Sequence, residues 1–83
     1  DVYKRQELDL RGMTAGEAVA VLSNFLDGAM LANLSQVRII HGKGSGVLRK
    51  AVQDELKHNR AVKRYRLGVY GEGEDGVTIA ELA

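Results

Sequence analysis

One octapeptide sets the architecture of this chain, Ile39-Ile40-His41-Gly42-Lys43-Gly44-Ser45-Gly46. The β-branched residues before His41 favour a strand, and the three alternating glycines predict a tight turn that leads into a helix. A strand, a glycine-rich turn and a helix N-terminus together present backbone N–H groups and the positive end of a helix dipole. This arrangement favours an anion such as phosphate, and His41 and Lys43 stand beside it.

Residues 8–12, Leu-Asp-Leu-Arg-Gly, predict a short strand upstream of the octapeptide. The period of two residues places Leu8 and Leu10 on one face and Asp9 and Arg11 on the other. Two side chains of opposite charge therefore emerge together at the end of this strand.

A helix should follow, because Thr14 and Glu17 have the spacing of a capping box, with the helix beginning at Ala15. Asn33 suits the left-handed position just after its end. One broad apolar face should pack on a sheet, and it comprises Val19, Leu22, Leu26, Ala29 and Met30, widened by Val21 and Phe25.

The part of the chain after the octapeptide predicts a second helix and two more strands. The helix ends at residues 57–59, and its apolar stripe comprises Val47, Leu48, Ala51, Val52 and Leu56. Strands at 62–67 and 77–82 are joined by an acidic, glycine-rich hairpin loop. The order is β-α-β-α-β-β, which predicts an α/β two-layer sandwich: a mixed four-stranded sheet with both helices on one face.

Composition limits the classes of protein to consider. The chain has 83 residues, enough for one small domain, and it has no cysteine, which excludes disulfides, thiolate metal sites and cysteine nucleophiles. No run is long enough for a membrane span and nothing resembles a signal peptide, so we expect a cytoplasmic protein without a membrane partner. Residues 38–66 hold nine basic and two acidic residues, a net charge of +7, which is typical of a polyanion-binding face or of an ordinary solvated surface.

The first six residues, Asp-Val-Tyr-Lys-Arg-Gln, resemble the translation of a transposon-end adapter used in preparing sequencing libraries. We therefore treat residues 1–6 as non-native and expect the domain to occupy residues 7–83. The natural chain is then expected to continue upstream.

Polar groups follow the first two strands at the point where each strand ends. The first strand ends with Asp9 and Arg11, and the second with His41, Gly42, Lys43 and Gly44. In open α/β sheets ligands bind beyond the carboxyl ends of parallel strands, so we expect both sets to meet at one edge. These groups suit phosphodiester chemistry, because Arg11 and Lys43 can stabilise charge on phosphate oxygens while His41 moves protons.

Several roles stay open for Asp9. It could orient water, hold His41 in one tautomer, or bind a divalent cation such as magnesium or manganese. A plainer interpretation makes Asp9 and Arg11 a surface ion pair, His41 a strand-end histidine bonded to backbone, and the glycines a means of turning the chain. The convergence of all these groups favours the functional interpretation.

These motifs resemble those of the small MutS-related (Smr) domain family. The resemblance rests on Leu8-Asp9-Leu10-Arg11-Gly12, on the octapeptide with its continuation to Arg49, and on residues 73–78, Gly-Glu-Asp-Gly-Val-Thr. It implies a fold similar to the C-terminal domain of a translation initiation factor. It also implies either nicking endonuclease activity or binding to branched DNA, or to RNA and ribosomes.

The family motifs map onto particular residues of this chain. The expected catalytic residues are Asp9, Arg11 and His41, and the expected phosphate contacts are Gly42, Lys43, Gly44, Ser45 and Arg49. Many relatives carry histidine where this chain has Arg11. The arginine form resembles the domain at the C-terminus of bacterial MutS-like ATPases outside mismatch repair, which implies a parent protein that dimerises through upstream domains.

The leading hypothesis from the sequence is a nicking endonuclease module. The alternative is a module that binds DNA, RNA or the ribosome without cutting. A third interpretation, a tail that only stabilises a larger ATPase, predicts no binding by the isolated domain.

Overall fold

The computed structural model describes residues 6–83 and confirms the predicted order of elements. These elements are β1 (Glu7–Asp9), α2 (Ala15–Leu31), β2 (Gln36–Ile40), α3 (Val47–His58), β3 (Val62–Leu67), the short 3-10 helix η1 (Glu74–Gly76) and β4 (Val77–Leu82). Of the segment interpreted as an adapter, only Gln6 lies within the described residues. None of the helices in residues 6–83 combines the length and the apolarity needed to cross a bilayer.

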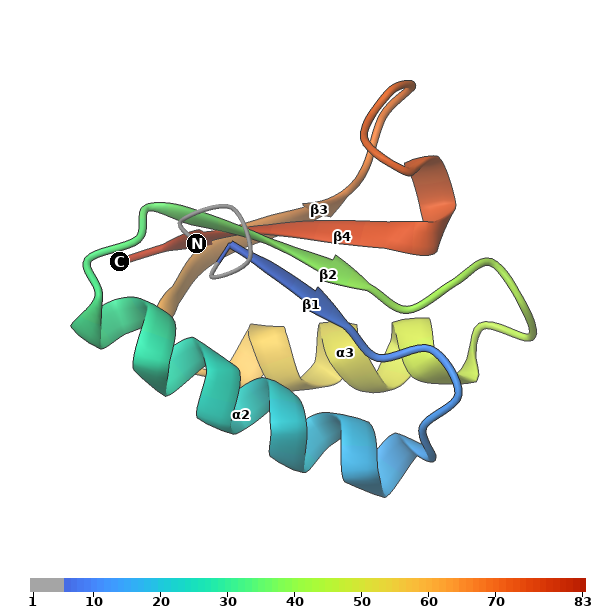
Figure 1. Ribbon diagram of the computed structural model, residues 1–83, viewed down its shortest axis with the longest axis horizontal. Coiled ribbons are helices and arrows are strands. Elements are labelled where there is room, and N and C mark those ends of the chain that lie inside the picture. The colour runs from blue at the N-terminus through green and yellow to red at the C-terminus, as the bar shows by residue number, and fades with distance from the viewer. Residues whose placement is uncertain (1–5) are drawn as a thin grey trace.

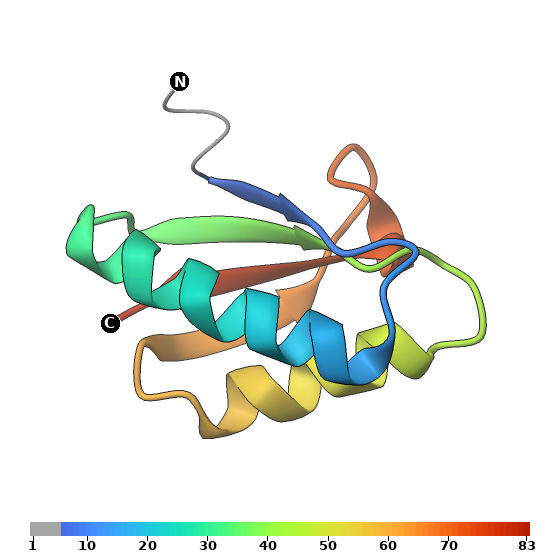
Figure 2. The same ribbon diagram turned by 60° about the horizontal axis from the view of Figure 1, so that its bottom comes forward.

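The four strands form one mixed sheet in the order β1-β2-β4-β3. β1 and β2 are parallel, whereas β4 pairs antiparallel with both β2 and β3. Both helices cover the same face of this sheet, which confirms the predicted two-layer sandwich (Figures 1 and 2). The last strand is thus inserted between the second and the third, and its N-terminal end lies beside the C-terminal end of β2.

Local interactions fix both ends of α2. The Thr14 hydroxyl accepts a hydrogen bond from the Glu17 amide at 3.2 Å, and the Glu17 carboxylate accepts one from the Thr14 amide at 2.9 Å. At the other end, Asn33 has φ 59° and its amide donates to the Met30 carbonyl at 3.0 Å. The Leu34 amide donates to the Ala29 carbonyl at 3.0 Å, which completes a Schellman motif. The predicted capping box and left-handed Asn33 are confirmed.

The core lies between the helices and the sheet, and its buried members are Leu10, Ala18, Leu22, Leu26, Ala29, Val37, Ile39, Val52, Leu56, Ala80 and Leu82. Two residues assigned to the apolar stripes are exposed instead, Met30 at 46% and Val47 at 59%. Met30 lies in the last turn of a 17-residue helix, about 25 Å long, which extends beyond strands of at most six residues. Val47 is the first residue of α3 and precedes the part of the helix that packs on the sheet.

Candidate functional site

The two sequence motifs meet at the C-terminal edge of β1 and β2. The Leu10 amide donates to the Ile40 carbonyl at 2.8 Å and continues the pairing of these strands past Asp9. Gly42 has φ 85°, and a Cβ atom placed on it would lie 3.4 Å from Cγ of Arg11. The side chain of Arg11 therefore packs over the turn that begins at Gly42.

Asp9 and Arg11 form a bidentate ion pair on the side of the sheet that faces away from the helices. Arg11 Nε and Nη2 donate to the two carboxylate oxygens of Asp9 at 3.0 and 2.7 Å, and the Arg11 amide donates to Oδ1 at 3.0 Å. These hydrogen bonds lower the pKa of Asp9 to about 2. Both side chains remain substantially exposed. Asp9 is therefore an ionised carboxylate near neutral pH and a weak base while Arg11 holds it.

His41 lies on the opposite side of the sheet, on the face covered by the helices. His41 is 5% exposed, with Nδ1 3.0 Å from the Gly42 carbonyl and Nε2 2.8 Å from the hydroxyl of Thr78, which is fully buried. A carbonyl oxygen can only accept, so Nδ1 carries the proton and neutral Nε2 accepts from the hydroxyl. Within residues 6–83 the partners of the ring are Gly42 and Thr78, so it is these residues, and not Asp9, that hold the tautomer.

Lys43 points to the acidic turn before β4. Its Nζ donates to Glu74 Oε2 at 2.8 Å and lies 3.8 Å from Asp75 Oδ1, and the contact with Glu74 raises the pKa of Lys43. The turn itself packs on the octapeptide, because the Gly76 carbonyl accepts hydrogen bonds from the amides of His41 and Gly42 at 3.1 and 2.9 Å. The acidic, glycine-rich loop, which the sequence analysis placed only as the connection of a hairpin, is thus part of the site.

A pocket of about 260 Å³ opens between the N-termini of the two helices. Its walls are formed by Met13, Thr14, Ala15, His41, Gly42, Gly44, Ser45, Gly46, Val47, Leu48 and Arg49. α2 is capped by its own side chains, whereas the N-cap of α3 is Gly46, which makes no side-chain capping bond. The Ser45 hydroxyl lies 3.4 Å from the Val47 amide. The amides of Leu48 and Arg49, in the first turn of α3, have no hydrogen-bond partner among residues 6–83, and both residues line the pocket.

The predicted site residues fall into two groups on either side of the Gly42 turn. His41, Gly42, Gly44, Ser45 and Arg49 line the pocket. The pairs Asp9–Arg11 and Lys43–Glu74 lie on the rim, with no hydrogen bond to the His41 ring among residues 6–83. A ligand that contacts both groups would have to cross the edge of the sheet.

Much of the positive charge in residues 38–66 is neutralised by carboxylates from outside that segment. Arg38, Lys43, Arg64 and Arg66 pair with Glu7, Glu74, Glu81 and Glu72 respectively. The basic residues of the segment without an ion-pair partner among residues 6–83 are Arg49, Lys50, Lys57, Arg60 and Lys63. Arg49 is the one of these that lines the pocket.

The side chains of the described part of the chain do not form a cage for a metal ion. Among residues 6–83 no three histidine, aspartate or glutamate side chains are grouped closely enough to coordinate one. Mg²⁺ is commonly bound by one or two carboxylates together with substrate phosphates, and Asp9 is the carboxylate that the sequence suggested for such a role. Because Arg11 already binds both oxygens of Asp9, a metal ion would have to compete with Arg11 for this carboxylate.

Two residues important to this geometry were missed by the sequence analysis. Thr78 is the buried partner of His41, and Glu74 is the partner of Lys43. Thr78 alternates with the core residues Ala80 and Leu82, so its inward orientation could have been inferred. Threonine is common in strands, however, and its pairing with a histidine 37 residues away depends on the insertion of β4 beside β2.

The burial of His41 predicts a pH dependence. Burial lowers the pKa of His41 below its ordinary value of 6.5, although the bond to Gly42 opposes this shift. The folded state then binds fewer protons than the unfolded state just below pH 6.5, so the contribution of His41 to stability is complete above that pH and is lost as the pH falls through the folded pKa. A His58→Gln variant leaves one histidine, whose ring C–H resonances should titrate by NMR with a midpoint below 6.5. A midpoint at or above 6.5 would contradict the buried, neutral ring.

Comparison with known proteins gives one family for nearly the whole chain. The family model for the Smr domain matches residues 8–83. The chain is 60% identical over 76 residues to endonuclease MutS2 of Symbiobacterium thermophilum and 59% identical over 75 residues to that of Clostridium beijerinckii. These matches cover 92% and 90% of this chain but 10% of each relative. The chain therefore spans about a tenth of the length of these relatives.

Solved structures agree with the sequence relatives. The crystal structure of the Smr domain of Thermus thermophilus MutS2 superposes with a TM-score of 0.91 at 38% identity, covering 94% of this chain and 98% of that one. YdaL, a stand-alone small MutS-related protein from Escherichia coli, superposes with a TM-score of 0.89 at 25% identity, covering 95% and 65% of the two chains. Domains of this fold thus occur both within a long protein and alone.

Proposed function

This chain belongs to the Smr domain family, and from that premise and the geometry of its site we propose that it binds nucleic acid through backbone phosphates and nicks the bound strand. One observation carries the proposal: the uncapped N-terminus of α3 opens into a pocket that also holds His41 and Arg49. A phosphate there would accept from the free amides of α3 and pair with the unengaged guanidinium. The relatives named endonuclease support cleavage as the purpose of this binding.

The rim residues suggest how binding would lead to chemistry. In the free protein Asp9 and Glu74 occupy the positions that phosphate oxygens would take on Arg11 and Lys43. A phosphodiester can displace Asp9 from Arg11, because the planar guanidinium binds phosphate with the same two-pronged geometry. Arg11 would then stabilise the negative charge that develops on the nonbridging phosphate oxygens as water attacks phosphorus. The released Asp9 carboxylate would orient that water and accept its proton, while the P–O ester bond breaks and the leaving oxygen takes a proton from solvent.

The geometry favours a positioning role for His41. Both ring nitrogens are bonded and the ring is almost completely buried, so the ring reaches a substrate proton only if Nε2 leaves the Thr78 hydroxyl. In the bonded state, the ring supports the Gly42 carbonyl and thereby the turn that forms the pocket wall. We therefore place the chemistry on Arg11 and Asp9 and assign His41 to holding the turn.

A second function is favoured by a different observation. Asp9–Arg11 and Lys43–Glu74 are closed ion pairs, and an arrangement of this kind can bind phosphate by exchange of partners without cutting it. The alternative is a module that binds DNA, RNA or the ribosome and leaves the strand intact. The two functions share the same contacts and differ only in whether the bound strand is then cut.

Incubation with supercoiled plasmid tests the proposal. We expect this chain to convert the plasmid to the open-circular form, and we expect binding of a fluorescein-labelled duplex to weaken as salt rises, with a linear loss on a log–log plot. Parallel reactions with Mg²⁺, with Mn²⁺ and with chelator show whether a divalent cation is required. Salt-sensitive binding without nicking in any of them would exclude cleavage in favour of the alternative, and no binding would exclude both.

A further inference from the structure

Glu72 makes several hydrogen bonds that connect the loop between β3 and β4, residues 68–76, to the sheet. The Glu72 carboxylate accepts from Arg66 Nη1 and Nη2 at 2.7 and 3.1 Å and from the Val69 amide at 3.0 Å. Its backbone carbonyl accepts from Arg38 Nη2 at 3.1 Å. Arg66 and the Val69 amide lower the pKa of Glu72 to about 2, so the carboxylate stays ionised throughout the neutral range.

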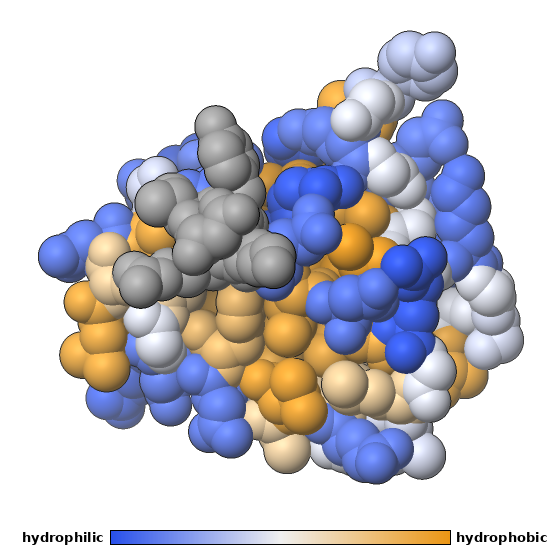
Figure 3. Space-filling model, in the orientation of Figure 1, coloured by the Kyte–Doolittle hydropathy of each residue, from blue (hydrophilic) through white to orange (hydrophobic). Residues whose placement is uncertain are grey.

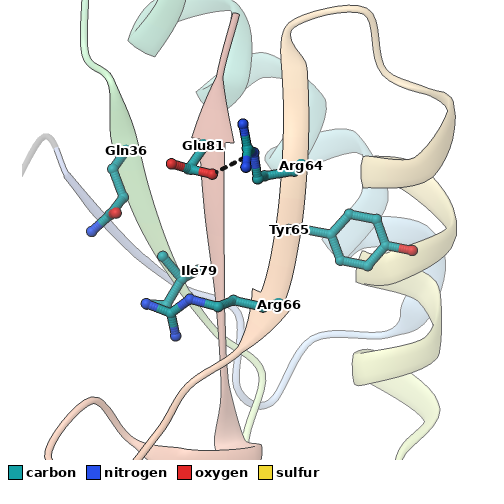
Figure 4. A pocket seen from close by; sticks show the side chains of 6 residues that line it. All are labelled: Gln36, Arg64, Tyr65, Arg66, Ile79 and Glu81. Atoms are coloured by element: carbon teal, nitrogen blue, oxygen red, sulfur yellow. Dashed lines mark ion pairs between the residues drawn. The ribbon is translucent and has the colours of Figure 1, made fainter.

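The arginines that hold this loop come from the face of the sheet that the helices leave open. Arg38 on β2 and Arg66 on β3 are both in register with Ile79 on β4, so they flank it across the sheet. Figure 4 shows Arg66 extending over Ile79 on this face, whereas Tyr65 points the other way, towards α3. Tyr65 packs against the core, so it is not available on this face.

The tip of the loop presents an apolar surface to water. Tyr70 is 92% exposed and its neighbour Val69 is 58% exposed. The loop projects from the body of the molecule, at the upper right of Figures 1 and 3. Single exposed apolar residues are ordinary, but an ordered loop that holds an aromatic ring almost fully in water gains nothing in stability from that ring.

The same loop is joined to the candidate site at its other end. Glu74 pairs with Lys43, and the Gly76 carbonyl accepts from the His41 and Gly42 amides. Tyr70 precedes Glu74 by four residues, which span at most about 14 Å. That distance corresponds to about four stacked bases along one strand at 3.4 Å each. A strand whose phosphate lies at the rim would therefore bring its bases within reach of the ring.

We propose that Tyr70 is a base-stacking residue, which packs against an unpaired nucleobase a few nucleotides from the phosphate held at the Arg11–Lys43 rim. This inference rests on the proposed function and adds to it a residue, Tyr70, that would recognise an unpaired base. An aromatic face accepts any base, and aromatic side chains of proteins that bind single strands stack on bases that are not paired. Val69 would extend the apolar surface beneath the base.

Two labelled DNA ligands of equal length test this inference, one a fully paired duplex and the other a duplex with an unpaired single-stranded branch. Tyr70→Ala should weaken binding of the branched ligand by about tenfold, which is the usual cost of removing one stacking aromatic, and should leave binding of the paired duplex unchanged. Tyr70→Phe should bind both ligands as the wild type does, because the ring is kept. The matched control is Leu31→Ala, which removes another exposed apolar residue (86% exposed) at the far end of α2.

A direct readout is available because the chain has no tryptophan. Tyr70→Trp supplies a single indole whose fluorescence should be quenched on adding the branched ligand and should stay unchanged with the paired duplex. Wild-type binding combined with equal affinity of Tyr70→Ala and no quenching in Tyr70→Trp would overturn the stacking role and leave the proposed function standing. Absence of nucleic-acid binding by the wild type would instead overturn the proposed function, and the stacking role with it.

Discussion

Replacing Arg11 with alanine is expected to lower the rate of plasmid nicking at least about 100-fold, the usual loss when one donor to a developing oxyanion is removed. The fold should survive, because the pair with Asp9 is exposed and such pairs contribute at most about 1 kcal/mol to stability. Binding of a labelled duplex should weaken far less than nicking, because Lys43, Arg49 and the amides of α3 remain. The measurements are initial nicking rates and fluorescence anisotropy on the same preparations.

Two further variants make this result specific. Arg64→Ala is the matched control, because Arg64 is also an exposed arginine, paired with Glu81 at 2.8 Å, but lies on the edge strand β3 away from the pocket. It should nick at the wild-type rate. Arg11→Lys keeps the charge without the planar fork and should recover part of the activity. Equal losses in Arg11→Ala and Arg64→Ala would indicate a general effect of positive charge and contradict the role given to Arg11.

The fold could be predicted from the sequence because its local patterns agree with its tertiary structure. The Thr14–Glu17 capping box, the left-handed Asn33 and the β-branched run before His41 each specify a boundary through short-range chemistry. The strands at residues 62–67 and 77–82 were predicted with the bounds that the structure has. The insertion of β4 between β2 and β3 was not predicted, because a hairpin pattern fixes only the partner next to it in sequence.

The candidate site could be located from the sequence but its internal pairing could not. The edge of the sheet follows from strand order, so Arg11 and Gly42 were expected to lie together. Which side chain Lys43 contacts depends on how residues 68–76 fold, and that depends on Glu72 and on two arginines from separate strands. The partner of His41 likewise depends on β4. Contacts of this kind join residues 31 to 37 positions apart and leave no local pattern.

Thr78→Val should lower the free energy of unfolding by about 1–3 kcal/mol, although the two side chains have nearly the same shape. The reason is that valine removes the only hydroxyl within reach of His41 Nε2 in the described chain and leaves that nitrogen buried without a partner. For a domain of this size each kcal/mol corresponds to a fall of roughly 4–8 °C in Tm. Thermal and urea unfolding, followed by circular dichroism above pH 6.5, measure the change.

A double-mutant cycle shows whether the cost of Thr78→Val arises from the lost hydrogen bond to His41 or from the packing of Thr78 itself. If the cost of Thr78→Val arises from His41, the same substitution in a His41→Gln background should cost measurably less, with a coupling of at least about 0.5 kcal/mol, since residues in direct contact couple by that amount or more. Additive losses would mean that Thr78 contributes through its own packing alone. The Thr78→Val variant also tests the role of the His41 ring. If His41 holds the turn, the variant should bind phosphate more weakly than the wild type. If His41 instead carries a proton once Nε2 is released from Thr78, the variant should keep the wild-type binding and nicking rate.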